Sequence, residues 1–227
     1  MHKITPASED SLLIYFGHQI DPDLVRMIAG FSQQLQRTMA ELIVDLVPSY
    51  TSLLVRYDLS LVSYESIYAR IEQLLADYRP DDQSYNSQTI HIPVYYSPEV
   101  GLDLTQLLVQ KNLTLEEFIE IHSAQAYLIY AIGFAPGFAF LGEVDARIQA
   151  PRLSTPRVSI PAGSVGIADS QTAVYPTQSS GGWNIIGRTV LDLSLNDPKN
   201  IDRFKVGDYV QFYPISRDEY LKNGGQL

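Results

Sequence analysis

The sequence lacks cysteine altogether, although it has 227 residues and 45% of them are hydrophobic. Without thiols the chain cannot form disulfides, thiolate metal sites or a cysteine nucleophile. It also lacks any G-x-G or Gly-Lys sequence, so neither the dinucleotide fingerprint nor the common phosphate-binding loop is present. The four histidines are never two or four residues apart, and no G-x-S-x-G motif occurs. No local metal site or serine nucleophile motif is therefore indicated.

Positive charge is scarce as well. The chain has 16 Lys and Arg against 26 Asp and Glu, a net charge of −10. Such a chain repels phosphate backbones and anionic lipids, which disfavours nucleic-acid and membrane partners. Residues 121–142 carry no Asp, Glu, Lys or Arg, but Gly and Pro interrupt this run and favour buried soluble structure. The first ten residues lack the apolar run of a signal peptide, so we expect a cytoplasmic protein.

Strand and helix patterns alternate in the N-terminal part. Strands are expected near Lys3 and over residues 11–17, 42–47, 52–57 and 89–96. A helix is expected from Pro22, with Asp21 as its cap, and a second one over residues 64–77. This order is the β-α-β-β-α-β pattern of ferredoxin-like domains. We therefore expect a chain of the α+β class that begins with a ferredoxin-like α/β domain over residues 1–88.

The C-terminal part has a different composition. Residues 123–187 carry three acids and three bases and hold eight of the fourteen glycines. Short strands between Gly and Pro turns are typical of a β-barrel or a sandwich. They are expected at 127–132, 138–141, 157–160, 165–167, 172–175, 184–188 and 209–213. We assign residues 89–227 to this second domain, and the polar run at 79–88 to the linker.

Two short helices are expected to precede these strands. Asp103 is the predicted cap of the first, and Thr114 with Glu117 forms a capping box for the second. The tail beyond Asp218 is expected to be frayed.

Three arginines lie among Pro, Gly and aromatic residues, where a guanidinium is partly desolvated. A desolvated guanidinium favours a planar anion such as a carboxylate or phosphate. The alternative is structural pairing with the nearby acids Glu143, Asp145 and Asp169. Neither alternative is excluded for Arg152, Arg157 and Arg188.

Further candidates come with equally plain alternatives. His122, at a helix end, is either a hydrogen-bonded structural residue or a general acid–base. Gln171 offers an amide suited to a lactam, or a turn hydrogen bond. Trp183 follows two glycines and either walls a pocket or fills the core. Ser164 and Thr189 are candidate hydroxyl contacts.

Five ordered blocks resemble a known family. They are GFAPGFAFL at 133–141, PRLSTPR at 151–157, IPAGSVGI at 160–167, QTAVYP at 171–176 and GGWNIIGRT at 181–189. In this order they resemble the B subunit of the prokaryotic 5-oxoprolinases. That family also includes kinase-A inhibitor proteins and proteins once named allophanate hydrolase subunit 1.

The resemblance implies a cyclophilin-like β-barrel for the second domain. It implies a component of an ATP-dependent hydrolase that opens 5-oxoproline to glutamate, together with the A and C subunits. Because this chain has no nucleotide or catalytic motif of its own, we expect it to be inactive alone and the ATP site to be unconventional or shared with a partner. The alternative that the family suggests is a regulatory protein that inhibits a sensor histidine kinase.

Site residues follow from the same resemblance, and no metal is among its implications. The residues implied to be catalytic are His122, Arg157 and Arg188. Those implied to contact substrate are Phe134, Pro136, Gly137, Arg152, Gly163, Gln171, Gly182, Trp183 and Thr189. Two positions depart from the family pattern, since Phe140 stands where tyrosine is expected and Ser180 where proline is expected.

Overall fold

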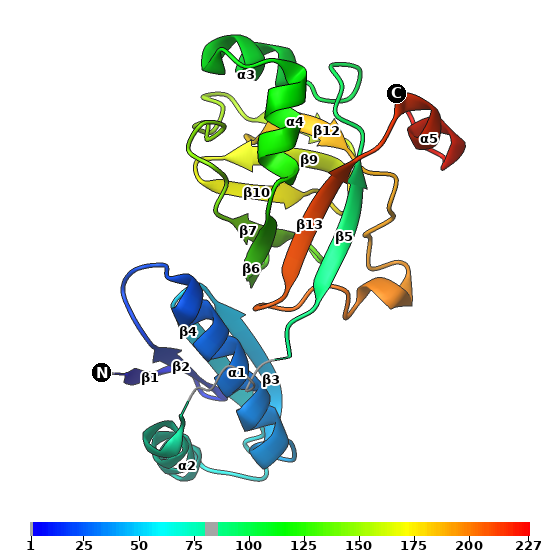
Figure 1. Ribbon diagram of the computed structural model, residues 1–227. Helices are drawn as coiled ribbons and strands as arrows, with labels where there is room; N and C mark the ends of the chain where they lie inside the picture. Colours follow the sequence, from blue (N-terminus) through cyan, green and yellow to red (C-terminus); the bar gives the residue numbers. More distant parts are fainter. Residues whose placement is uncertain (1, 80–85) are drawn as a thin grey trace. The chain divides into compact units, whose positions relative to one another are not determined.

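The computed structural model describes residues 2–79 and 86–227, which form two compact units, Met1–Ser87 and Gln88–Leu227 (Figure 1). Most of the expected linker at 79–88 lies outside the described residues. None of the helices in the described ranges combines the length and apolar content that a membrane crossing requires.

The first unit is a four-stranded antiparallel sheet with two helices. Its strand order is β1-β2-β4-β3. The elements are β1 (Lys3–Ser8), β2 (Ser11–Tyr15), α1 (Pro22–Met39), β3 (Ile43–Ser49), β4 (Ser52–Tyr57) and α2 (Tyr64–Asp77). The expected start of α1 is confirmed, because Pro22 opens the helix and the Asp21 side chain accepts a hydrogen bond from the Asp23 amide.

The apolar residues of this unit form one core. Leu12 and Ile14 of β2, Phe31 of α1 and Ile71 of α2 are fully buried in it. Burial of each such side chain contributes roughly 1.5–3 kcal/mol to folding.

The expected ferredoxin-like pattern is only partly present. The strand expected to complete it, β5 (Thr89–Val94), belongs to the second unit, where it pairs in parallel with β13 (Tyr209–Pro214). In the first unit β1 instead pairs with the outer side of β2. The pattern misled here because strand pairing over about 120 residues leaves no local signal.

The second unit is built around a large, mainly antiparallel sheet. The strands follow the order β5-β13-β6-β7-β10-β9-β12. The remaining strands of this sheet are β6 (Ala126–Ile132), β7 (Ala139–Gly142), β9 (Ser164–Ala168), β10 (Gln171–Val174) and β12 (Asn184–Arg188). A separate antiparallel pair consists of β8 (Arg157–Ile160) and β11 (Ser179–Gly181).

The expected β-barrel does not close through these ladders. The outermost strands, β5 and β12, meet only at a single antiparallel bridge between Tyr95 and Arg188. Both backbone hydrogen bonds of this bridge are present, at 2.9 and 3.0 Å. The strands therefore form a large sheet whose ends touch at one residue pair.

Helices pack against strands of this sheet. Helix α3 (Leu104–Lys111) contacts β12, and α4 (Leu115–Ser123) contacts β13. The short 3-10 helix η1 (Pro198–Asn200) and α5 (Arg217–Lys222) follow later in the chain. The predicted Thr114–Glu117 capping box of α4 is confirmed.

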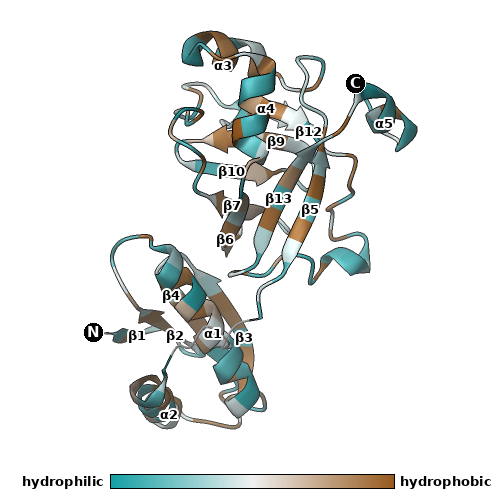
Figure 2. Ribbon diagram, in the orientation of Figure 1, coloured by the Kyte–Doolittle hydropathy of each residue, from teal (hydrophilic) through white to brown (hydrophobic). Residues whose placement is uncertain are grey.

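The tail expected to be frayed beyond Asp218 contains the ordered helix α5. This helix has its own capping box, formed by Ser216 and Glu219. Figure 2 shows α5 as mostly hydrophilic, in contrast to the apolar β6.

Candidate functional site

The residues singled out from the sequence fall in three places of the second unit. His122, on the last turn of α4, lies in the core, and Trp183 lies in an aromatic cluster on the opposite face of the sheet. Arg188, Gly163 and Thr189 line a pocket at the end of β12. Successive strand residues point to opposite faces, which is why Thr172 of β10 reaches His122 while Ala173 reaches the cluster around Trp183.

His122 is completely buried, with both ring nitrogens engaged. The Thr172 hydroxyl donates to the Gly166 carbonyl at 3.0 Å, so it can only accept from His122 Nε2, also at 3.0 Å. His122 Nδ1 is then the acceptor for the Tyr96 hydroxyl at 2.7 Å. This network assigns the neutral tautomer with its proton on Nε2.

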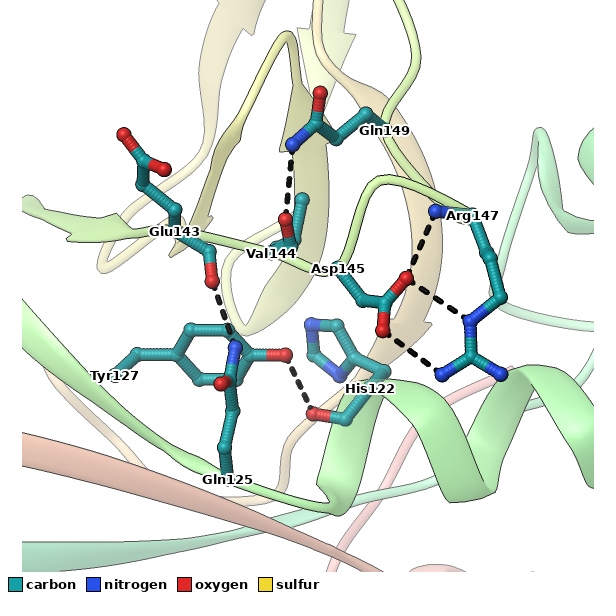
Figure 3. A network of polar contacts seen from close by, with 8 residues as sticks. All are labelled: His122, Gln125, Tyr127, Glu143, Val144, Asp145, Arg147 and Gln149. Carbon is teal, nitrogen blue, oxygen red and sulfur yellow. Dashed lines mark hydrogen bonds and ion pairs between the residues drawn. The ribbon is translucent and has the colours of Figure 1, made fainter.

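The surroundings keep His122 neutral. Burial lowers the pKa of its imidazole from 6.5 to about 3. The Phe212 ring stacks on the imidazole at a centroid distance of 4.8 Å. The Tyr127 hydroxyl donates to the His122 carbonyl, as Figure 3 shows. This geometry favours the structural interpretation of His122, because no part of its ring is open to a substrate.

Trp183 is one member of the aromatic cluster. Its ring meets Phe138 edge-on at 5.7 Å, and Phe138 in turn contacts Phe134, Phe140 and Tyr175. Phe134 has a positive φ of 70° and remains 66% exposed. The cluster therefore joins a buried aromatic core to an exposed aromatic residue on the surface.

Arg152 lies at the edge of this cluster. Its guanidinium carbon is 6.0 Å from the centroid of the Trp183 ring. Its Nε is 3.8 Å from an Asp169 carboxylate oxygen, and both side chains are mostly exposed. Such a contact stabilises folding by no more than about 1 kcal/mol, so Arg152 keeps the capacity to meet an anion.

Four more residues from the sequence prediction lie on turns or strand ends nearby. Gln171 begins β10 and pairs with Ala168 of β9. A Cβ added to Gly182 would lie 3.5 Å from the Leu153 carbonyl oxygen and 3.7 Å from the Pro156 ring. Pro136 and Gly137 belong to the turn before β7, and Gly137 has a φ of +81° that favours glycine.

Arg157 is paired far more tightly than Arg152. Its two terminal nitrogens donate to the two carboxylate oxygens of Asp103 at 2.9 and 2.6 Å. Asp103 is 4% exposed and also accepts from the Ile185 amide at 2.7 Å. Asp103 occupies the N-cap position of α3, as predicted, but its side chain makes no cap hydrogen bond and instead binds Arg157 of β8 and the Ile185 amide of β12. This geometry favours the structural interpretation of Arg157.

One of the acids expected as partners of the arginines, Asp145, is engaged elsewhere. Figure 3 shows Asp145 bound to the neighbouring Arg147, with contacts of 3.0 and 2.8 Å to its guanidinium. In the same loop the Gln125 and Gln149 amides donate to the Glu143 and Val144 carbonyls. Of the three expected acids, only Asp169 approaches a predicted arginine within the described residues.

Arg188 has no acidic partner in the described ranges 2–79 and 86–227. Its Nε donates to the Ala162 carbonyl at 2.9 Å, and one terminal nitrogen donates to the Gln226 carbonyl at 3.2 Å. Within those ranges, no Asp or Glu carboxylate lies within 4.0 Å of its guanidinium. The Arg188 guanidinium, with no carboxylate of the described residues to neutralise it, thus lies beside a pocket of about 330 Å³.

One wall of this pocket was missed by the sequence analysis. Tyr220 of α5 and the following Gly224, Gly225 and Gln226 line it. The Tyr220 ring stacks on Tyr95 at 5.0 Å, and its hydroxyl donates to the Gln226 carbonyl at 2.8 Å. The Ser216-x-x-Glu219 capping box was the sequence signal that could have placed this helix.

No metal centre is indicated by the described part of the chain. Nowhere in it do three or more His, Asp or Glu side chains converge as metal ligands.

The chain is similar to a known protein family and to two curated proteins over most of its length. The family described as "Carboxyltransferase domain, subdomain C and D" matches residues 2–201. The chain is 36% identical to the B subunit of 5-oxoprolinase from Bacillus subtilis, over 96% of this chain and 95% of that protein. It is 35% identical to the B subunit of 5-oxoprolinase from Haemophilus influenzae, over 92% of this chain and 96% of that protein.

A solved structure shares the fold. The crystal structure of TTHA0988 matches with a TM-score of 0.77 and 29% identity, over 91% of this chain. The chain spans 40% of the length of that protein, which therefore carries a large additional part.

Proposed function

This chain belongs to the family of 5-oxoprolinase B subunits, and we propose that it acts as the B subunit of an ATP-dependent hydrolase that opens 5-oxoproline to glutamate. The observation that carries this proposal is the 36% identity that extends over 95% of a curated 5-oxoprolinase B subunit. When two proteins match over nearly their whole lengths, we expect them to be the same subunit of an enzyme rather than different proteins that share one domain.

The chemistry assigned to this chain is binding and positioning. A lactam is stabilised by resonance, and ATP supplies the activation that makes its opening feasible. The sequence contains no common phosphate-binding loop. The described residues therefore do not fit a nucleotide site of the usual kind, and we place ATP on a partner or at a surface shared with one.

The A and C subunits of the enzyme are the proposed partners. The exposed Phe134, the half-buried Phe140 and the exposed Arg152 beside Trp183 offer an aromatic surface with one cation, which suits a protein partner. Compatible with this proposal, TTHA0988 carries additional chain beyond the part that matches this one. We further propose a cytoplasmic complex.

The finer fold description is also part of the proposal. We propose that residues 1–88 and 89–227 are separate domains and that the second is cyclophilin-like. The two compact units and the nearly closed sheet of the second unit support this proposal.

The test is reconstitution of the purified chain with the A and C subunits, followed by an assay of 5-oxoproline-dependent ATP hydrolysis and glutamate release. We expect turnover from the complete mixture and none from this chain alone, because it lacks a nucleotide loop and a nucleophile motif. A complete mixture with no turnover would refute the proposed reaction. Robust turnover by the single chain would refute its dependence on partners.

A further inference from the structure

The pocket beside Arg188 joins three segments that are distant in sequence. They are the turn before β9, the end of β12 with the residues that follow it, and α5 with the chain after it; Pro176, just after β10, adds a fourth contact. Its volume of about 330 Å³ admits a small molecule rather than a polymer. We use the name Arg188 pocket for the site lined by Ala162, Gly163, Pro176, Arg188, Thr189, Val190, Leu191, Asp192, Tyr220, Gly224, Gly225 and Gln226.

The walls of the Arg188 pocket are fixed by backbone contacts. Arg188 and Tyr95 exchange two backbone hydrogen bonds, and Thr189 donates to the Gly163 carbonyl at 2.8 Å. Gly163 has a φ of +79°, and a Cβ at that position would lie 2.6 Å from the Thr189 carbonyl oxygen. The positions of Arg188 and Thr189 are therefore set before any ligand binds.

The hydrogen-bonding groups of the pocket are incompletely used by the protein. The Arg188 guanidinium donates to neutral carbonyls, which are weaker acceptors for it than a carboxylate. The Thr189 hydroxyl accepts from the Leu191 amide at 3.2 Å and keeps its own hydrogen for donation. Hydrogen bonds from Ser194 hold the pKa of the Asp192 carboxyl below its usual range. The pocket thus offers a cation, a hydroxyl donor and a separate anionic acceptor.

We infer that the Arg188 pocket binds a small cyclic amide acid, with Arg188 holding the ligand carboxylate. A guanidinium fork matches a carboxylate in two parallel hydrogen bonds, and the ligand would take over the contact now made by the Gln226 carbonyl. Asp192 supplies an acceptor for a lactam N–H. This inference rests on the proposed function and names the residues through which the chain selects 5-oxoproline over lactams without a carboxylate.

The first experiment measures KM and kcat for 5-oxoproline in the complete enzyme, with the wild-type chain, Arg188→Gln and Arg188→Lys. We expect Arg188→Gln to raise KM about 10- to 150-fold, the effect of losing one charge-assisted contact. Arg188→Lys should recover part of this loss, because it keeps the charge without the fork. Arg147→Gln is the matched control, since this exposed arginine pairs locally with Asp145. An unchanged KM in Arg188→Gln, or an equal rise in Arg147→Gln, would overturn the inference.

The second experiment is independent of turnover and of the partners. The chain alone is titrated calorimetrically with 5-oxoproline, with 2-pyrrolidinone, which lacks the carboxylate, and with cyclopentanecarboxylate, which lacks the lactam. We expect wild type to prefer the two carboxylates, and Arg188→Gln to lose that preference. Equal affinity of wild type for 5-oxoproline and 2-pyrrolidinone would overturn the inference. A complete enzyme that does not hydrolyse 5-oxoproline would refute the proposed function instead, and this titration would still decide whether Arg188 binds carboxylates.

Discussion

Arg157 and Arg188 show how two arginines of one unit differ when their partners differ. Arg157 is neutralised by the buried Asp103 through two short hydrogen bonds. Arg188 donates to carbonyl groups and lies beside a pocket. The first arrangement stabilises the protein and neutralises the guanidinium, whereas the second leaves a charge that a ligand can neutralise. The sequence surrounds both arginines with similar residues, so the difference becomes visible only in three dimensions.

The largest expected loss of stability comes from removal of the Asp103–Arg157 contact. Asp103→Ala leaves Arg157 without its counter-charge and the Ile185 amide without an acceptor. We expect a loss of about 3–5 kcal/mol in the free energy of unfolding, measured in urea. Asp145→Ala, which removes an exposed ion pair, should lose much less stability than Asp103→Ala. Similar losses in the two variants would show that the Asp103 contact is no stronger than a surface pair.

His122 provides the next largest effect, through pH. Its pKa is about 3 in the folded chain and 6.5 when unfolded, so the unfolded state binds the proton first. This contribution to stability is complete above pH 6.5 and is lost as the pH falls toward 3. At pH 4.5 the wild type should lose about 2–3 kcal/mol more than His122→Gln, each relative to its own value at pH 7. Parallel pH profiles of unfolding free energy would contradict the buried neutral imidazole.

Gly163→Ala tests the wall of the Arg188 pocket. The added methyl group meets the Thr189 carbonyl at 2.6 Å, in a backbone conformation that alanine adopts at a cost. We expect a loss of about 1–3 kcal/mol in unfolding free energy, together with a higher KM for 5-oxoproline. Gly133→Ala is the control, because a Cβ there meets nothing within 4 Å. An unperturbed KM in Gly163→Ala would show that the wall does not position Arg188.

The smallest effect on stability is expected for Arg152→Gln. This side chain is 60% exposed, and its contact with Asp169 is long at 3.8 Å. The unfolding free energy should fall by less than about 1 kcal/mol, which calorimetric melting can check. A loss as large as that of Asp103→Ala would move Arg152 to the same structural group as Arg157.

Local signals predicted much of the fold. The Asp21 cap, the Pro22 start and the Thr114–Glu117 capping box lie within a few residues of the helices that they define. Short strands between Gly and Pro turns likewise predicted most strands of the second unit. The Ser216–Glu219 capping box was an equally local signal, and it was overlooked.

Long-range partners could not be predicted in this way. Asp103 lies 54 residues from Arg157, and at its own position it has the pattern of a helix cap. The pairing of β5 with β13 and the packing of Tyr220 on Tyr95 join segments more than 100 residues apart. Since each depends on tertiary packing, the sequence identified the three arginines as a group without separating their roles.

The most direct test of the different roles of Arg188 and Arg157 is the KM for 5-oxoproline of complete enzymes that carry Arg188→Gln or Arg157→Gln. Each enzyme is assayed at the same concentration of folded chain. We predict that KM rises about 10- to 150-fold in Arg188→Gln and less than about 3-fold in Arg157→Gln, whose loss should fall on stability instead. A rise in KM confined to Arg157→Gln, with Arg188→Gln unchanged, would contradict the account.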